Sequence, residues 1–102
     1  DYNKAIEFKS KYYEAYYNRG VLKMELNDEQ GAMEDFNKAL EANPKLPQAY
    51  YNRGVLKSKS RDNQGALDDF NKALGVNPKL TQAYVNRGVV KDELGDILGA
   101  IE

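Results

Sequence analysis

The chain repeats one seven-residue pattern, Ala-Tyr-x-Asn-Arg-Gly-Val, three times. Its glycines are Gly20, Gly54 and Gly88, so successive copies are 34 residues apart. Between the two complete units, residues 13–46 and 47–80, 23 of 34 positions are identical. A fixed period in this range indicates that each unit is one supersecondary element, which buries its apolar face only by stacking on its neighbours.

Each unit contains two helical patterns and no strand pattern. In the second unit, small and apolar residues recur on one side of residues 48–60, and apolar residues recur at the helical period along residues 64–76. Pro47 suits a first helical turn, while an Asn-Pro pair after each second helix ends it, because Pro disfavours a helical predecessor. The sequence therefore predicts an all-α chain of antiparallel helix pairs.

Polar residues mark where these helices should begin. We expect Asp28, Asp62 and Asp96 to cap the second helix of each unit, with Gly95 in the turn before Asp96. Thr81 takes the place of Pro47 one unit later and suits an N-cap.

Small and aromatic residues predict how the helices pack. The three glycines lie inside helices, where Gly costs about 0.5–1 kcal/mol relative to Ala, so a steric reason is expected. We expect the alanines of the second helices to face them, with Phe36 and Phe70 filling the space beside them. The helical period assigns one tyrosine column to the core and leaves a second column more exposed. The first column is Tyr16, Tyr50 and Tyr84, and the second is Tyr17 and Tyr51.

The repeat register also divides the chain. Residues 1–12 align with the second-helix half of a preceding repeat, residues 13–46 and 47–80 are repeats, and residues 81–102 are a partial repeat. Neither end carries the polar cap that solenoids require. We therefore expect a fragment of a longer array, or a chain that stacks end to end on other copies.

Composition excludes several function classes. The chain has 102 residues with no Cys and no His, which removes disulfides, imidazole bases and the commonest zinc ligands. Its net charge of −1 gives no basic excess for nucleic acid, and no apolar run approaches the roughly 20 residues of a membrane span. We expect no catalysis, cofactor, metal, nucleic acid or membrane partner, and a soluble protein for which the cytoplasm is the default compartment.

Basic residues recur beside each glycine. Arg19 and Lys23 lie four residues apart on one helical face, as do the equivalent pairs Arg53–Lys57 and Arg87–Lys91. One interpretation is a ladder of ion pairs to Glu34-Asp35 and Asp68-Asp69 on the second helices. The other is a basic stripe for an acidic ligand. The balanced net charge favours internal pairing.

The spaced residues resemble the tetratricopeptide repeat family over the whole chain. The family pattern of aromatic, Gly, Ala, aromatic, Ala and Pro is met twice, as Tyr16, Gly20, Ala32, Phe36, Ala39 and Pro44, and as Tyr50, Gly54, Ala66, Phe70, Ala73 and Pro78. Arg before each Gly and Lys three residues after it depart from the family. The resemblance implies a right-handed α-solenoid of 34-residue repeats that binds partners in a concave groove.

By the same resemblance, residues of each first helix line that groove. The expected contacts are Tyr17, Asn18, Val21, Tyr51, Asn52, Val55, Lys59, Val85, Asn86 and Val89, with Glu14, Met24, Glu25, Gln48, Ser58, Gln82, Asp92 and Glu93 at the flanking positions. The Asn column has two interpretations, a local or solvated role and an amide ladder that grips a ligand's main chain.

Some family members clamp C-terminal carboxylates with Lys and Asn. Here Tyr17 and Tyr51 replace the Lys and Val21 replaces the Asn. An extended or helical peptide with apolar anchors therefore fits better.

Two functions remain open from the sequence. The first is a non-catalytic interaction module or scaffold that presents its groove to a peptide or protein segment. The alternative is a structural array that associates head to tail through its ends, and the similarity between units is also what an engineered or idealised repeat protein would show.

Overall fold

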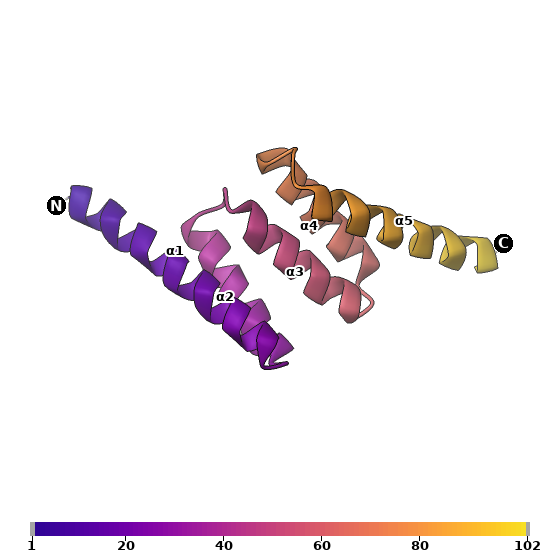
Figure 1. The fold of residues 1–102 in the computed structure, drawn as a ribbon, viewed down its shortest axis with the longest axis horizontal. Coiled ribbons are helices and arrows are strands. Elements are labelled where there is room, and N and C mark those ends of the chain that lie inside the picture. Colours follow the sequence, from indigo (N-terminus) through magenta and orange to yellow (C-terminus); the bar gives the residue numbers. More distant parts are fainter. Residues whose placement is uncertain (1, 102) are drawn as a thin grey trace.

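A computed structural model shows five α-helices arranged along an elongated body of 59 × 29 × 20 Å (Figure 1). It describes the backbone of residues 2–101 and the side chains of residues 12–96. The helices are α1 (Tyr2–Glu25), α2 (Glu29–Ala42), α3 (Pro47–Lys59), α4 (Asn63–Val76) and α5 (Thr81–Ile101). Helices that are consecutive in the chain pack on one another, most extensively α1 on α2 and α3 on α4, and the described backbone contains no strand. The predicted all-α solenoid of helix pairs is confirmed.

Two turns of the same design join α1 to α2 and α3 to α4. In each, one residue adopts the left-handed conformation and reverses the chain, Asn27 at φ 64° and Arg61 at φ 68°. The residue that follows is an aspartate, whose Oδ1 accepts a hydrogen bond of 3.0 Å from the backbone N–H three residues ahead. Asp28 and Asp62 therefore cap α2 and α4, as the sequence predicts.

The third predicted cap, at Asp96, is wrong. α5 continues through Gly95 and Asp96, and Gly95 does not adopt a positive φ. A continuous helix keeps the backbone hydrogen bonds that a turn at Gly95 would break. Thr81, predicted as an N-cap, is instead the first residue of α5.

α1 is also continuous across a position where the other units end a helix. α2 and α4 stop before the Asn-Pro pairs at residues 43–44 and 77–78, where the Asn Oδ1 accepts the backbone N–H two residues ahead at 3.1 Å. At the same register α1 has Lys9 and Ser10, which do not obstruct a helix. The assignment of residues 1–12 and 81–102 to incomplete repeats stays a prediction.

The core lies within each helix pair and is centred on a phenylalanine. Phe36 and Phe70 are fully buried. A Cβ built on Gly20 would lie 2.8 Å from Phe36 Cε1, and one on Gly54 would lie 2.7 Å from Phe70 Cε1. The sequence correctly predicts a steric need for these glycines but assigns the wrong neighbour, because the phenylalanine rings supply the nearest atoms and the alanines do not.

The tyrosine columns differ from the prediction. Tyr50 packs against two core clusters, whereas Tyr84 is 45% exposed. Tyr17 and Tyr51, predicted to be the exposed pair, are half-buried with their rings 5.9 and 5.8 Å from Phe36 and Phe70. Residues of the two columns are adjacent in the sequence, so the helical period places both near the core-facing side of the helix. The period alone does not show which of two adjacent residues is more buried.

Candidate binding groove

The residues predicted to line a groove come from the first helix of each unit, α1, α3 and α5. The structure gathers most of them around two depressions between successive first helices. The first lies between α1 and the start of α3, and the second lies between the end of α3 and α5. We call these two depressions together the first-helix groove.

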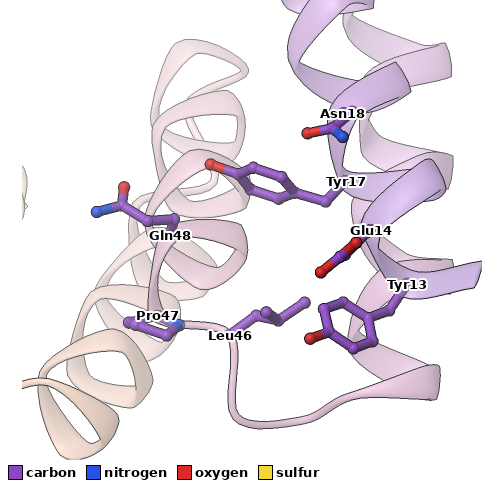
Figure 2. A pocket seen from close by; sticks show the side chains of 7 residues that line it. All are labelled: Tyr13, Glu14, Tyr17, Asn18, Leu46, Pro47 and Gln48. Carbon is purple, nitrogen blue, oxygen red and sulfur yellow. The ribbon is translucent and has the colours of Figure 1, made fainter. Parts of the chain in front are cut away.

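The first depression has a volume of about 380 Å³ (Figure 2). Tyr17 and Asn18 line it from α1, as predicted, together with Glu14 and Gln48. Figure 2 shows the Tyr17 ring extending from α1 across the gap toward Gln48 of α3. The depression is thus an apolar hollow edged by one carboxylate and two amides.

The sequence prediction missed part of this first depression. Tyr13, Leu46 and Pro47 also line it. Leu46 and Pro47 belong to the loop and first turn that begin α3, and a pattern restricted to the middle of the first helices excludes them. The sequence offers one signal that could have indicated this wall. The first position of each unit differs between the units, being Tyr13, Pro47 and Thr81.

The second depression is smaller, at about 170 Å³. Its lining from α3 includes the predicted Val55 and Lys59, and its lining from α5 includes the predicted Asn86 and Val89. Val21 is half-buried against the first core cluster, and Val85 is 60% exposed and lines neither depression.

Tyrosine and asparagine side chains join neighbouring first helices along the groove. Asn52 Nδ2 donates to Tyr17 Oη at 3.5 Å, and Asn86 Nδ2 donates to Tyr51 Oη at 3.0 Å. Burial raises the pKa of Tyr17, and the bond from Asn52 opposes that shift. Both interpretations of the Asn column are therefore incomplete, since Asn52 and Asn86 hold one repeat to the next. Asn18, by contrast, is exposed in the first depression.

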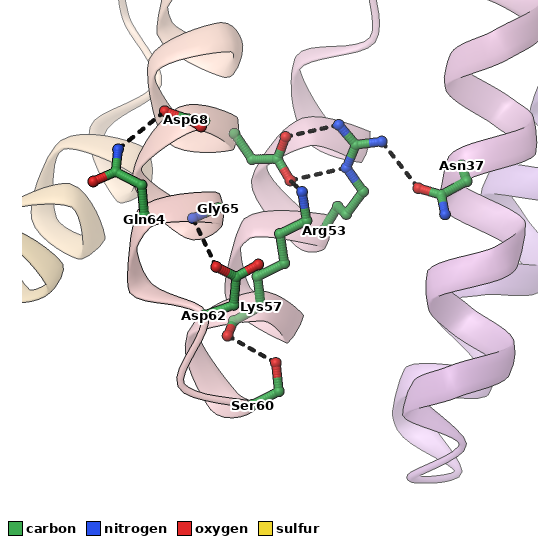
Figure 3. Close-up of polar contacts among 9 residues, drawn as sticks. Asn37, Arg53, Lys57, Ser60, Asp62, Gln64, Gly65 and Asp68 are labelled. Carbon is green, nitrogen blue, oxygen red and sulfur yellow. Dashed lines mark hydrogen bonds and ion pairs between the residues drawn. The ribbon is translucent and has the colours of Figure 1, made fainter.

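The Arg–Lys stripe forms the predicted ion-pair ladder in both complete units, and Figure 3 shows the contacts of the second unit. Asp69 is 1% exposed and accepts Arg53 Nε at 2.8 Å and Arg53 Nη2 at 2.7 Å, with Lys57 Nζ at 3.1 Å. These bonds raise the pKa of Arg53. Arg53 Nη1 also donates to Asn37 of the preceding repeat at 2.9 Å.

The first unit repeats this arrangement with Asp35, Arg19 and Lys23. The hydrogen bonds from Arg19 hold the pKa of Asp35 below its usual value against the opposing effect of burial. In these two units the basic residues are paired within the protein, which favours the ion-pair interpretation over a basic stripe for an acidic ligand. Arg87 and Lys91, at the third step, have no ion pair among the described residues.

A third hollow, of about 410 Å³, is polar and lies beside the α3–α4 turn. Its lining includes Arg61, Asn63 and Asp96. Asn63 is 8% exposed and its Oδ1 has no hydrogen-bond partner. Such an atom carries a desolvation cost, and a water molecule in the hollow would relieve it.

Two other kinds of site are absent where the structure can be assessed. Among the described residues, no group of three or more acidic side chains is arranged to bind a metal ion. The same residues include no helix with the length and apolarity needed to cross a membrane.

Comparison with known proteins identifies the repeat. The family model for the tetratricopeptide repeat matches residues 13–46 and 47–80. A search of curated protein sequences found no match. Among solved structures, a crystal structure of MamA is 25% identical with a TM-score of 0.79, and it covers 91% of this chain while the chain spans 58% of MamA.

Two further structures share the fold at lower identity. The second TPR of Spaghetti (RPAP3), bound to the HSP90 peptide SRMEEVD, has a TM-score of 0.84 at 19% identity and covers 91% of this chain and 85% of its own. The Arabidopsis OM64 TPR domain has a TM-score of 0.82 at 23% identity and covers 86% and 73%. Because the family model matches two complete units, the chain belongs to the tetratricopeptide repeat family.

Proposed function

We propose that this chain is a non-catalytic protein-interaction module that receives a peptide or protein segment along the first-helix groove. The observation that supports this most is the pair of depressions between successive first helices, each combining apolar side chains with amides. The Tyr–Asn bonds between repeats hold the walls of these depressions in a fixed relation. A preformed surface of this kind favours binding, because less conformational entropy is lost on association.

The lining favours a ligand with apolar anchors. The first depression offers Tyr17 and Leu46 for an apolar side chain, and Asn18 and Gln48 can pair with a peptide main chain. Its one charged residue is Glu14, which repels a terminal carboxylate. We therefore do not propose the peptide seen on the Spaghetti domain as a ligand of this chain. The proposed ligand is a segment with a basic or neutral polar residue beside an apolar one.

The test is a peptide-display selection on the wild-type chain, followed by affinity measurements on the selected peptides. Glu14→Lys and Gln48→Ala alter the first depression at exposed positions. They are preferable to Tyr17→Ala, because the Tyr17 ring packs on Phe36 and its removal would also lower stability. We expect each variant to weaken binding at least severalfold while the melting temperature is unchanged.

The matched control is Glu41→Lys, the same charge change at an exposed position of α2, outside the depressions. It should bind as the wild type does. Peptides whose affinity is insensitive to all the groove variants would contradict the groove proposal. The peptide SRMEEVD should show no saturable binding, and tight binding would refute the argument based on Glu14.

A second candidate function is association of copies end to end. The observation that favours it is the exposed side of α5 around Gly88. A Cβ built on Gly88 would have no described atom of another element within 4 Å, whereas Gly20 and Gly54 are each covered by a phenylalanine. In the two complete units, the equivalent side of the first helix is buried by the second helix of the same unit, because a repeat buries its apolar side only against a neighbouring helix.

A further inference from the structure

The polar hollow of about 410 Å³ beside the α3–α4 turn adjoins the first-helix groove. Ser58 and Lys59 line both this hollow and the second depression. The remaining residues that line the hollow are all polar or charged, namely Arg61, Asn63, Glu93 and Asp96. A segment bound in the second depression therefore lies next to the hollow and can place one of its side chains there.

The hollow contains a buried acceptor without a partner among the described residues. Asn63 is 8% exposed, and its Oδ1 receives no hydrogen bond from them. The backbone at this residue is held in place, because Asn63 begins α4 and the preceding Asp62 caps that helix through the Gly65 N–H. A buried acceptor of this kind costs free energy until a donor reaches it. The hollow therefore favours a ligand group that donates hydrogen bonds.

The equivalent junction between the two complete units shows which donor fits. By the 34-residue repeat, Asn63 is equivalent to Glu29, and Glu93 is equivalent to Lys59. Lys59 Nζ lies 4.0 Å from Glu29 Oε1, so the chain supplies its own ammonium group at that junction. At the junction between α4 and α5 the same two positions are an amide and a carboxylate, and both provide acceptor oxygens. Neither of these two residues supplies the cation that the first junction contains.

The charged residues around the hollow also favour a cation. Glu93 and Asp96 provide two carboxylates, and Lys59 and Arg61 provide two basic groups. Lys59 is paired with Glu29, whereas the other three have no ion pair among the described residues. The carboxylates of the lining therefore outnumber its unpaired basic groups.

An anionic ligand is less well supported at this place. Arg61 would attract it, but Glu93 would repel it. The positive end of the α4 helix dipole would favour an anion as well, but the Asp62 carboxylate already caps this end. An anion would also leave Asn63 Oδ1 without a donor.

We propose that the hollow receives the basic side chain, lysine or arginine, of a segment bound in the first-helix groove. The ammonium or guanidinium group donates to Asn63 Oδ1 and pairs with Glu93, while an apolar side chain of the same segment packs on Val55 and Val89 in the second depression. The hollow is far larger than the roughly 30 Å³ that a water molecule occupies in the liquid, so it has room for a long side chain. This inference rests on the first proposed function and names the ligand chemistry at one end of the groove.

The first experiment compares three series of peptides with blocked ends on the wild-type chain by fluorescence anisotropy. Each peptide has one leucine and, at a varied distance from it, a lysine, a norleucine or a glutamate in a neutral background. We expect the lysine peptide to bind about tenfold more tightly than its norleucine counterpart at one of these distances, as for a gained charge-assisted hydrogen bond. Equal binding of the two would contradict the inference, and a preference for glutamate would assign the hollow to an acidic side chain instead.

Matched variants locate the lysine preference. Glu93→Gln and Glu14→Gln make the same change at exposed positions, one in the hollow and one in the first depression. Only Glu93→Gln should lower the ratio of lysine affinity to norleucine affinity. A ratio that depends on Glu14 and is independent of Glu93 would place the basic side chain in the first depression and rule out the proposed contact.

The donor can also be supplied from within the chain. Glu93→Lys places an ammonium group at the position that Lys59 occupies in the first junction. It should abolish the lysine preference and raise the melting temperature by about 2 °C or more, because Asn63 Oδ1 gains a partner. Asp92→Lys is the matched control, since Asp92 is an exposed neighbour that lines neither the hollow nor the second depression. It should change neither quantity, and an equal rise in both variants would reduce the effect to net charge and refute the role of Asn63.

Nuclear magnetic resonance tests the contact directly. The side-chain amide resonances of Asn63 should shift on addition of the lysine peptide and stay in place with the norleucine peptide. Asn77 is the internal reference, because its Oδ1 accepts the Lys79 N–H in the α4–α5 connection, away from the hollow. Lysine binding that leaves the Asn63 resonances unmoved would show that the basic group lies elsewhere.

The outcomes separate this inference from the proposed function. Display-selected peptides that lose affinity in Glu14→Lys and Gln48→Ala, with no lysine preference that depends on Glu93, would leave the groove standing and overturn the basic site. A wild type that binds no peptide of any kind would overturn both. A lysine preference that is lost in both Glu93 variants and kept in Asp92→Lys would support the site.

Discussion

At the scale of single residues, equivalent glycines have different surroundings. A side chain at Gly54 would meet Phe70, and a side chain at Gly88 would meet open space. We therefore expect Gly54→Ala to lower the free energy of unfolding by about 1–3 kcal/mol through overpacking. Gly88→Ala should raise it by about 0.5–1 kcal/mol, because Ala restricts the unfolded chain more than Gly does. Urea unfolding followed by circular dichroism measures both, and changes of the same sign would contradict this account.

Asp35 gives the protein a defined response to acid. Its pKa is lower in the folded state than in the unfolded chain, where a carboxyl titrates near about 4. As the pH falls, the unfolded state therefore takes up the proton first. The stability contributed by ionised Asp35 is complete above the pKa of the unfolded chain, and it is lost as the pH falls through the folded pKa. We expect the stability difference between wild type and Asp35→Asn to shrink as the pH falls through the folded pKa.

Unfolding in urea at a series of pH values tests this expectation. Glu34→Gln is the control, because Glu34 is the exposed neighbour of Asp35 on the same helix. Its stability should follow that of the wild type closely. A constant difference between wild type and Asp35→Asn from about pH 6 to about pH 2 would rule out the paired carboxylate as the cause.

At the scale of helices, one dipeptide decides whether a helix ends. Asn-Pro ends α2 and α4, whereas Lys9-Ser10 lets α1 continue. We expect Lys9→Asn with Ser10→Pro to break α1 near residue 10, because Pro in a helix interior costs about 3 kcal/mol or more. Hydrogen exchange should then show faster exchange of amides near residue 10 than in the wild type. Lys9→Asn alone should leave that protection in place, and equal protection in the double variant would contradict the explanation.

At the scale of the whole molecule, Arg53 connects three helices. From α3 it holds Asp69 of α4 and Asn37 of α2 (Figure 3). Among the described residues, Arg87 donates a hydrogen bond only to Asn71 of the preceding repeat, and its guanidinium lies over the Tyr84 ring. Arg53→Gln should therefore cost about 1–3 kcal/mol more than Arg87→Gln, because it leaves the buried Asp69 with Lys57 alone. Equal losses in urea unfolding would show that the pair to Asp69 contributes little.

Much of the fold could be predicted because each unit carries its own local signals. The 34-residue period, the Asn-Pro stops and the Asp caps at Asp28 and Asp62 act within a few residues of their own position. The prediction at Asp96 failed because a cap residue does not by itself end the helix before it, and α5 continues through this position. Thr81 does mark the start of a helix, but it is the first helical residue and not the cap before it. The predicted groove residues lie on the first helices, and several of them line the two depressions. Leu46 and Pro47, which also line the first depression, belong to a connection that helical periodicity does not describe.

The sequence by itself determined the repeat and the helix pairs, and it favoured pairing of Arg and Lys with acidic residues of the second helices, because these depend on residue spacing within one unit. The structure then showed that the partners are Asp35 and Asp69. Only the tertiary structure decided which tyrosine column lies on the phenylalanines, and that Asn52 and Asn86 bind tyrosines of the preceding repeat. It also decided that Gly88 and Arg87 are open while their equivalents are filled. Identical residues behave differently here because their environment depends on whether a neighbouring helix is present, and spacing within one unit does not contain that information.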